Sequence, residues 1–130
     1  MYLSERVRLG VALLWTLGIL IATTMPTGGV PNVEVSHMDK LVHFAMFFGF
    51  GTLWMWALPH PLKRRLGIVV IVGVMGAVGT EGLQLIVPFD RNPDIGDVVA
   101  NMLGLGAGIG LFLAMVQARR SESHPSVHTR

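Results

Sequence analysis

The sequence predicts an all-α fold: a polytopic membrane four-helix bundle with both termini in the cytoplasm. Three observations predict it. The 130 residues are 52% hydrophobic and only 14% charged, against roughly 25% charged in ordinary soluble domains. The apolar residues form four runs, each near the ~20 residues that a helix needs to cross a ~30 Å hydrocarbon layer. Proline begins each of the three connections between these runs.

The first predicted span covers residues 9–25 and follows Arg6 and Arg8. Basic residues before an apolar run are also typical of a secretory signal peptide. The Ala-Thr-Thr segment at 22–24 is, however, a poor cleavage site. A retained helix also gives an even number of spans. We therefore expect this segment to be a helix of the bundle.

The other three predicted spans cover residues 41–58, 66–87 and 95–116. Residues 1–118 would then form one transmembrane domain of four helices. The segment 119–130 is rich in Ser, His and Arg and has no apolar period. This composition predicts a disordered cytoplasmic tail.

The orientation follows from the basic residues. Eight of the ten Lys and Arg residues lie at the termini or in the connection 59–65: Arg6, Arg8, Lys63, Arg64, Arg65, Arg119, Arg120 and Arg130. Only Lys40 and Arg91 lie on the opposite side. Because cytoplasmic loops are enriched in Lys and Arg, both termini are predicted to be cytoplasmic in a plasma or inner membrane. The same placement explains the formal charge of +2 without a nucleic-acid partner.

One acidic residue, Glu81, interrupts an otherwise apolar span. A charged residue at the centre of a membrane helix costs about 2.5–3.5 kcal/mol even on insertion scales, so such residues usually face the protein interior and mark function. Glu81 lies fifteen residues beyond Leu66, which is about 22 Å along a helix. It is therefore expected roughly 8 Å below the outer boundary of a ~30 Å layer.

Polar residues of two other spans are expected in the same layer. By the helical rise, His43 lies about 4–5 Å and Asn101 about 9 Å below the outer boundary. Three pairs have the spacing of one helix face: Asp39 with His43, Glu81 with Gln84, and Asp97 with Asn101. A polar cluster formed by three helices is therefore predicted.

Glycines in the third and fourth spans are spaced for close packing. Gly104 with Gly108, and Gly106 with Gly110, follow the small-xxx-small pattern that lets helix backbones approach. The third span carries glycine at positions 73, 76, 79 and 82. We expect these two spans to pack closely and so to bring Glu81 near Asn101.

Two acidic residues also fit helix caps. The segments Ser36–Asp39 and Asp94–Asp97 have the spacing of a capping box, with Asp in place of the usual Glu or Gln. Capping is therefore an alternative role for Asp39 and for Asp94. Arg91 is likewise an alternative structural counter-ion for Glu81.

Several of these residues carry a family resemblance. The second span opens with Asp-Lys-Leu-Val-His at 39–43, and the third closes with Glu-Gly-Leu-Gln at 81–84. They are followed by Arg91, Asp97, Asn101 and Gly104. In this order, and across nearly the whole chain, the pattern resembles the VanZ-like family, which is named for a protein associated with resistance to the glycopeptide antibiotic teicoplanin. The resemblance implies a small integral membrane protein of the cell envelope and no particular reaction.

The candidate site residues fall into three roles. Glu81 and His43 are the candidate catalytic acid and base, and whether the protein is an enzyme is left open. The candidate ligand-binding residues are Asp39, Lys40, Gln84, Arg91, Asp97 and Asn101. Glu81, Asp97 and His43 carry donors that suit a divalent cation as cofactor, although no HExxH-type ligand motif is present.

These residues favour a protein that binds, and in one version processes, a lipid-linked or cell-wall-related anionic ligand at the outer membrane face. Such a protein would affect envelope chemistry or glycopeptide susceptibility. The expected partners are the lipid bilayer and a lipid-phosphate or cell-wall precursor, and an oligomer is left open. One alternative is a transporter or flippase component in which Glu81 and His43 relay protons. Another is a structural subunit whose polar cluster is an assembly latch.

Overall fold

A computed structural model describes residues 3–24, 35–86 and 94–122, and within them the side chains of 3–24, 38–83 and 94–121. These residues form four helices: α1 (Glu5–Thr24), α2 (Val35–Ala57), α3 (Leu62–Ile86) and α4 (Ile95–Glu122). The predicted all-helical, four-helix fold is confirmed. Three of the helices contain segments long and apolar enough to cross a membrane, namely Glu5–Thr24, Leu62–Leu83 and Ile95–Ser121.

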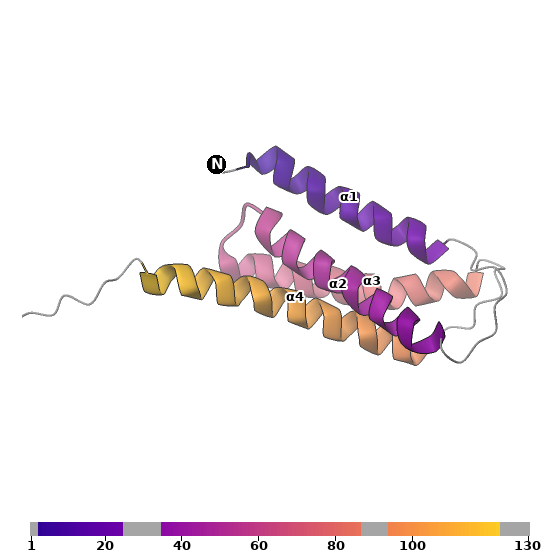
Figure 1. Ribbon diagram of the computed structural model, residues 1–130. Coiled ribbons are helices and arrows are strands. Elements are labelled where there is room, and N and C mark those ends of the chain that lie inside the picture. The colour runs from indigo at the N-terminus through magenta and orange to yellow at the C-terminus, as the bar shows by residue number, and fades with distance from the viewer. Residues whose placement is uncertain (1–2, 25–34, 87–93, 123–130) are drawn as a thin grey trace, which may run out of the picture.

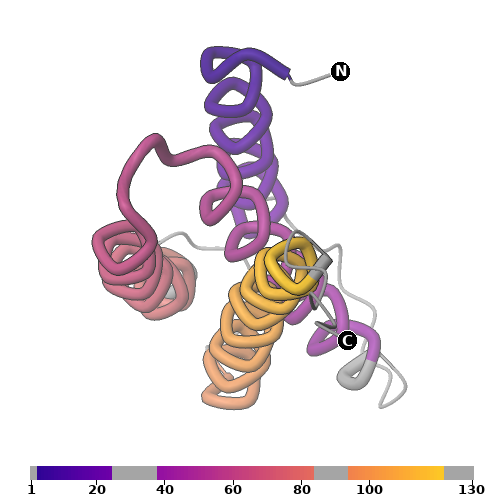
Figure 2. The backbone as a smooth tube through the Cα atoms, turned by 90° about the vertical axis from the view of Figure 1, so that its left-hand side faces the viewer, coloured from indigo at the N-terminus to yellow at the C-terminus, as the bar shows by residue number. Residues whose placement is uncertain are grey.

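By the same measure of length and composition, the described part of α2 is less apolar than these three segments. Asp39, Lys40 and His43 lie in its first turns and lower its apolar content. α2 packs against each of the other three helices, and it lies between α1 and α4 in Figures 1 and 2. Neighbouring helices therefore shield His43, whereas Asp39 and Lys40 remain partly exposed at the start of the helix.

The helices alternate in direction, so their ends gather into two groups (Figure 1). One end of the bundle holds the beginnings of α1 and α3 and the ends of α2 and α4; we call it the arginine end, after Arg8, Arg65 and Arg119. The opposite end holds Asp39, Glu81 and Asp97 and is called the carboxylate end. Basic side chains thus predominate at one end of the bundle and acidic ones at the other, with Lys40 and Glu5 as exceptions.

α2 and α4 share the most extensive contact in the bundle. Gly104 and Gly108 permit it, because a Cβ atom on either would collide with a backbone carbonyl oxygen of α2, that of Phe44 or that of Phe48. Gly51 makes the reciprocal approach, since a Cβ there would lie 2.8 Å from a backbone oxygen of α4. The two backbones therefore touch directly along this face.

The small-xxx-small prediction is confirmed for Gly104 and Gly108, but the predicted partner helix is wrong. These glycines pack on α2, not on α3. Gly106 and Gly110 make no such close contact with the described residues, since an added Cβ would meet no described atom within 4 Å. Of the α3 glycines, Gly73 faces α4, where it meets a leucine side chain. Small residues therefore join α4 mainly to α2.

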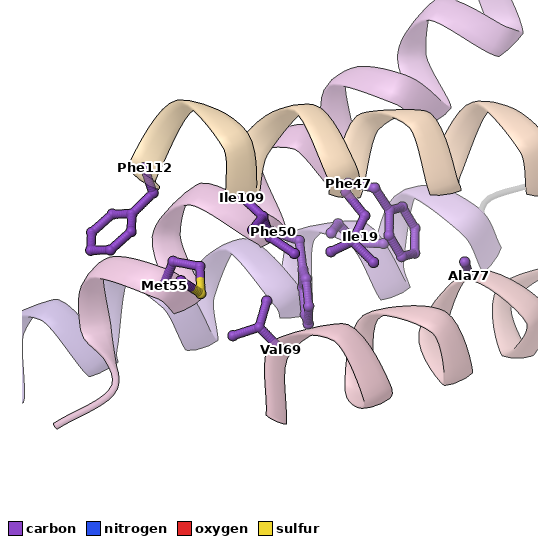
Figure 3. Packing of buried hydrophobic residues seen from close by; sticks show 9 residues of the cluster. Ile19, Phe47, Phe50, Met55, Val69, Ala77, Ile109 and Phe112 are labelled. Carbon is purple, nitrogen blue, oxygen red and sulfur yellow. The ribbon is translucent and has the colours of Figure 1, made fainter. Parts of the chain in front are cut away.

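Apolar side chains from all four helices fill the interior (Figure 3). The buried cluster consists of Ile19, Phe47, Phe50, Met55, Val69, Ala77, Leu105, Ile109 and Phe112. The outer faces are apolar as well: Leu14, Ile71, Met75 and Leu103 are each more than 60% exposed. Apolar faces on both sides of a helix are typical of a bundle in lipid.

α1 is joined to α2 by two indole hydrogen bonds. Trp15 Nε1 donates to the carbonyl oxygen of Met46 at 2.9 Å. Trp54 Nε1 donates to Thr16 Oγ1, also at 2.9 Å. The first apolar segment is therefore packed as a helix of the bundle, as expected.

α4 continues to Glu122, so Arg119 and Arg120 are helical, although they were predicted to lie in the disordered tail. Lys and Arg in a last helical turn interact favourably with the helix dipole, which accounts for the extension. Residues 123–130 of the predicted tail lie outside the described residues.

Candidate functional site

Three helices bring polar side chains together at the carboxylate end. α2 supplies Asp39, Lys40 and His43, α3 supplies Glu81, and α4 supplies Asp97 and Asn101. Four of these residues are buried in the bundle: His43, Glu81, Asp97 and Asn101. The structure therefore joins six of the eight predicted site residues. The other two, Arg91 and the side chain of Gln84, lie outside the described residues.

His43 is the centre of this cluster. Its Nδ1 lies 3.1 Å from Asn101 Oδ1. Because an amide oxygen only accepts, this bond places a proton on Nδ1. Glu81 Oε1 lies 3.8 Å from the same nitrogen, and Asp97 Oδ2 lies 3.9 Å from Nε2 on the other side of the ring.

The arrangement of His43 and Asp97 calls for a positive charge between them. In the neutral ring with a proton on Nδ1, Nε2 carries a lone pair. That lone pair and an ionised Asp97, 3.9 Å apart, repel each other. A proton or a bound cation between the two groups removes the repulsion, so this edge of the ring is suited to proton exchange or to metal binding.

Three residues could hold a metal ion here. Asp39, His43 and Asp97 each offer one ligand atom, and these atoms lie within 4.8 Å of one another. This set contains Asp39 where the sequence suggested Glu81. Glu81 is placed differently because it approaches the Nδ1 edge of His43, whereas Asp97 approaches the Nε2 edge.

Lys40 connects the cluster to the bundle surface. Its Nζ lies 2.6 Å from Asp94 Oδ2 and 3.7 Å from Asp97 Oδ1. The hydrogen bond from Lys40, reinforced by the backbone N–H of Gly96, holds the pKa of the Asp94 carboxyl below its ordinary value. Asp94 is therefore ionised at neutral pH, and Lys40 sits between two acidic side chains.

Asp94 caps α4, as the sequence predicted. Its Oδ1 accepts a hydrogen bond from Gly96 N at 2.8 Å, and its carbonyl oxygen accepts one from Asp97 N at 2.9 Å. Its ion pair with Lys40 was not predicted, because a cap is a local signal and Lys40 is fifty-four positions away. The capping alternative for Asp39 is not met, since α2 begins at Val35 and has no acidic residue in its first turn.

One buried donor of the cluster lacks a hydrogen bond to the described residues. It is Nδ2 of Asn101, a side chain with no exposed surface. Leaving such a group unpaired costs about 1–3 kcal/mol. An acceptor at this position, from water, a ligand or one of the remaining side chains, would therefore stabilise the cluster.

Comparison with known proteins identifies the chain. The model of the VanZ/LLP1 family matches residues 7–116, which includes the whole carboxylate end. An uncharacterized protein of Schizosaccharomyces pombe is 28% identical over 120 residues, which cover 92% of this chain and 71% of the relative. No solved structure matches significantly. The three apolar helices are consistent with a membrane protein. From the family match over four helices, the chain belongs to the VanZ/LLP1 family.

Proposed function

We propose that this VanZ-family membrane protein binds the phosphate of a lipid-linked or cell-wall-related ligand at its carboxylate end, together with a divalent cation. The observation that carries the proposal is the donor set of Asp39, His43 and Asp97 beside Lys40. Carboxylates and imidazole are suitable ligands of divalent cations. An ammonium group beside them can contact the same phosphate.

The charge of the cluster explains why a cation is part of the proposal. Asp39, Glu81, Asp94 and Asp97 outnumber Lys40 and would repel a bare phosphate. Mg²⁺ is usually held by one or two carboxylates together with substrate phosphates. A bound cation therefore converts an acidic cluster into a receptor for an anion.

The placement of this site suggests its biological effect. The distribution of Lys and Arg favours an orientation with the carboxylate end outside the cytoplasm. Binding a lipid-linked phosphate on that face would alter envelope chemistry and, through it, glycopeptide susceptibility. Should the ligand be processed, His43 and Glu81 are the groups placed to move a proton, with Nδ1 and Oε1 3.8 Å apart.

Binding of a polyprenyl phosphate to the full chain in lipid nanodiscs, with and without Mg²⁺, tests this proposal. Binding should require Mg²⁺ and should weaken about tenfold or more in Asp97→Asn and Asp39→Asn. Glu5→Gln removes an exposed carboxylate at the arginine end and should bind normally. Circular dichroism shows that each variant is folded. If the native chain binds the polyprenyl phosphate equally well without Mg²⁺, or if both cluster variants bind it as well as the native chain, the carboxylate end is not the binding site.

A second candidate function, an assembly latch, is favoured by the buried hydrogen bond between His43 and Asn101. A latch would hold α2 against α4 and would need no ligand. Asn101→Leu would then lower the amount of folded protein in the membrane, while polyprenyl phosphate and Mg²⁺ would leave the thermal stability of the native chain unchanged. A rise in stability with both additions supports the binding function instead.

A further inference from the structure

A cavity of about 480 Å³ lies at the arginine end, opposite the site described above. Three arginines from three helices border it, together with apolar side chains of α2 and α4: Arg8, Arg65, Arg119, Trp56, Phe112 and Met115. The cavity therefore combines positive charge with an apolar wall.

The charges of Arg8 and Arg65 are not neutralised by the described residues. Neither forms an ion pair with a described carboxylate; both bind backbone carbonyls instead. Arg8 Nη1 donates to the carbonyl oxygen of Trp56 at 3.1 Å. Arg65 donates from Nη1 to Met55 O at 2.7 Å and from Nη2 to His60 O at 2.9 Å. The two guanidinium groups repel each other across the cavity.

The hydrogen bonds to these carbonyls have a structural role, but they occupy only some of the N–H donors of each guanidinium group. Cations near a helix C-terminus satisfy its last carbonyls and complement its dipole, and both arginines do this for α2. A guanidinium carries five N–H donors, however. The Nε of Arg8 and the Nε of Arg65 are both buried without a hydrogen-bond partner in the described part of the chain. Each guanidinium thus keeps N–H donors beyond those that the carbonyl bonds use, and both residues border the cavity.

Aromatic rings hold the two guanidinium groups in place. The Cζ atom of Arg8 lies 5.9 Å from the centre of the Trp56 ring, and that of Arg65 lies 5.6 Å from the centre of the Phe112 ring. A cation–π contact at this distance attracts a guanidinium to the ring while leaving its N–H groups available for hydrogen bonds. The arginines are thus held in position for an anion.

We propose that this cavity binds the phosphate headgroup of an anionic membrane phospholipid. The phosphate accepts hydrogen bonds from Arg8, Arg65 and Arg119, since guanidinium groups bind phosphate in a bidentate manner. The start of the acyl chains lies along Phe112 and Met115. Basic pockets between transmembrane helices are suited to such headgroups, and the apolar wall gives a lipid contacts that a free phosphate cannot make. This site is independent of the proposed ligand at the carboxylate end.

Native mass spectrometry of the full chain with phosphatidylglycerol, phosphatidylcholine or inorganic phosphate tests the proposal. Phosphatidylglycerol should be retained over phosphatidylcholine, and inorganic phosphate should not displace it. Arg8→Gln and Arg65→Gln should each weaken phosphatidylglycerol binding about tenfold. Arg6→Gln and Arg64→Gln remove the same charge from exposed neighbouring positions outside the cavity, and they should bind like the native chain.

Arg119→Gln keeps the test informative if loss of Arg8 or Arg65 disturbs the fold. The side chain of Arg119 is exposed and makes no hydrogen bond to the described residues, so its replacement should leave circular dichroism unchanged. The expected loss in phosphatidylglycerol affinity is about fivefold. Equal retention of the two lipids, or equal losses in cavity and control variants, overturns the proposal. Displacement by inorganic phosphate would make this a site for a free anion and overturns it too.

Discussion

Nδ1 of His43 on α2 lies 3.1 Å from Oδ1 of Asn101 on α4, and this bond joins positions fifty-eight residues apart. Both side chains are almost fully buried. The bond fixes the imidazole ring, because the nitrogen that faces Asn101 turns the other nitrogen toward Asp97. Asn101 therefore determines which edge of His43 meets which acidic side chain.

Removal of Asn101 should destabilise the fold. Asn101→Ala leaves the Nδ1 proton of His43 buried without its acceptor, which should lower the free energy of unfolding by about 1–3 kcal/mol. Denaturant unfolding in detergent micelles measures this. In the double variant His43→Ala/Asn101→Ala the two losses should be less than additive. Strict additivity would show that the bond contributes nothing.

The glycine contact between α2 and α4 gives a prediction with a matched control on the same helix. Gly108→Ala places a methyl group against the backbone oxygen of Phe48 and should cost about 1–3 kcal/mol of stability. Gly110→Ala meets no described atom within 4 Å. It should be neutral or slightly stabilising, since alanine is the better helix former. Thermal unfolding of both variants measures the difference, and equal effects would contradict the contact.

The Lys40–Asp94 pair gives a pH dependence with a defined sign. Its hydrogen bond lowers the pKa of Asp94 from the ordinary value of 3.8. A depressed pKa stabilises the folded state above the pKa of the unfolded chain, and this contribution is lost as the pH falls through the folded value. Carboxyl-carbon NMR should show Asp94 titrating below 3.8. Lys40→Met should move that midpoint upward, whereas Lys63→Met should not.

The predicted orientation can be tested directly, since the chain contains no cysteine. Met38→Cys introduces a thiol at the carboxylate end, where Met38 is exposed, and Ser121→Cys introduces one at the arginine end. A membrane-impermeant maleimide should label Met38→Cys in intact cells and Ser121→Cys only after permeabilisation. The reason is the excess of Lys and Arg at the arginine end. The reverse pattern would place both termini outside.

The polar cluster was predictable because its signal is local and periodic. Side chains four residues apart share a helix face, and the helical rise gives their depth. These two regularities suffice to place His43, Glu81 and Asn101 in one layer. The metal-donor set was less accessible, because the edge of the His43 ring that each carboxylate approaches depends on tertiary packing.

Features that depend on the identity of a helix's neighbour could not be predicted from the sequence. Gly104 and Gly108 show that some backbone approaches closely, but spacing alone does not identify α2 as the neighbour. Likewise, the positions of Arg8 and Arg65 in the sequence indicate which side of the membrane their segments face. Their convergence on one cavity follows only from the antiparallel arrangement of the helices. The sequence pattern thus specifies which helix face a side chain lies on and how deep it lies in the membrane, whereas packing specifies the neighbouring helix.

The direct backbone contact at Gly51, Gly104 and Gly108 has a mechanical consequence. α2 and α4 can neither rotate nor slide past each other without breaking this contact, so the two helices form one rigid unit. Movement within the bundle is left to α1 and α3, which pack less extensively, and of these two α3 bears Glu81. A displacement of α3 relative to α2 and α4 would change the distance from Glu81 to His43. It would leave the geometry of His43, Asp97 and Asn101 intact.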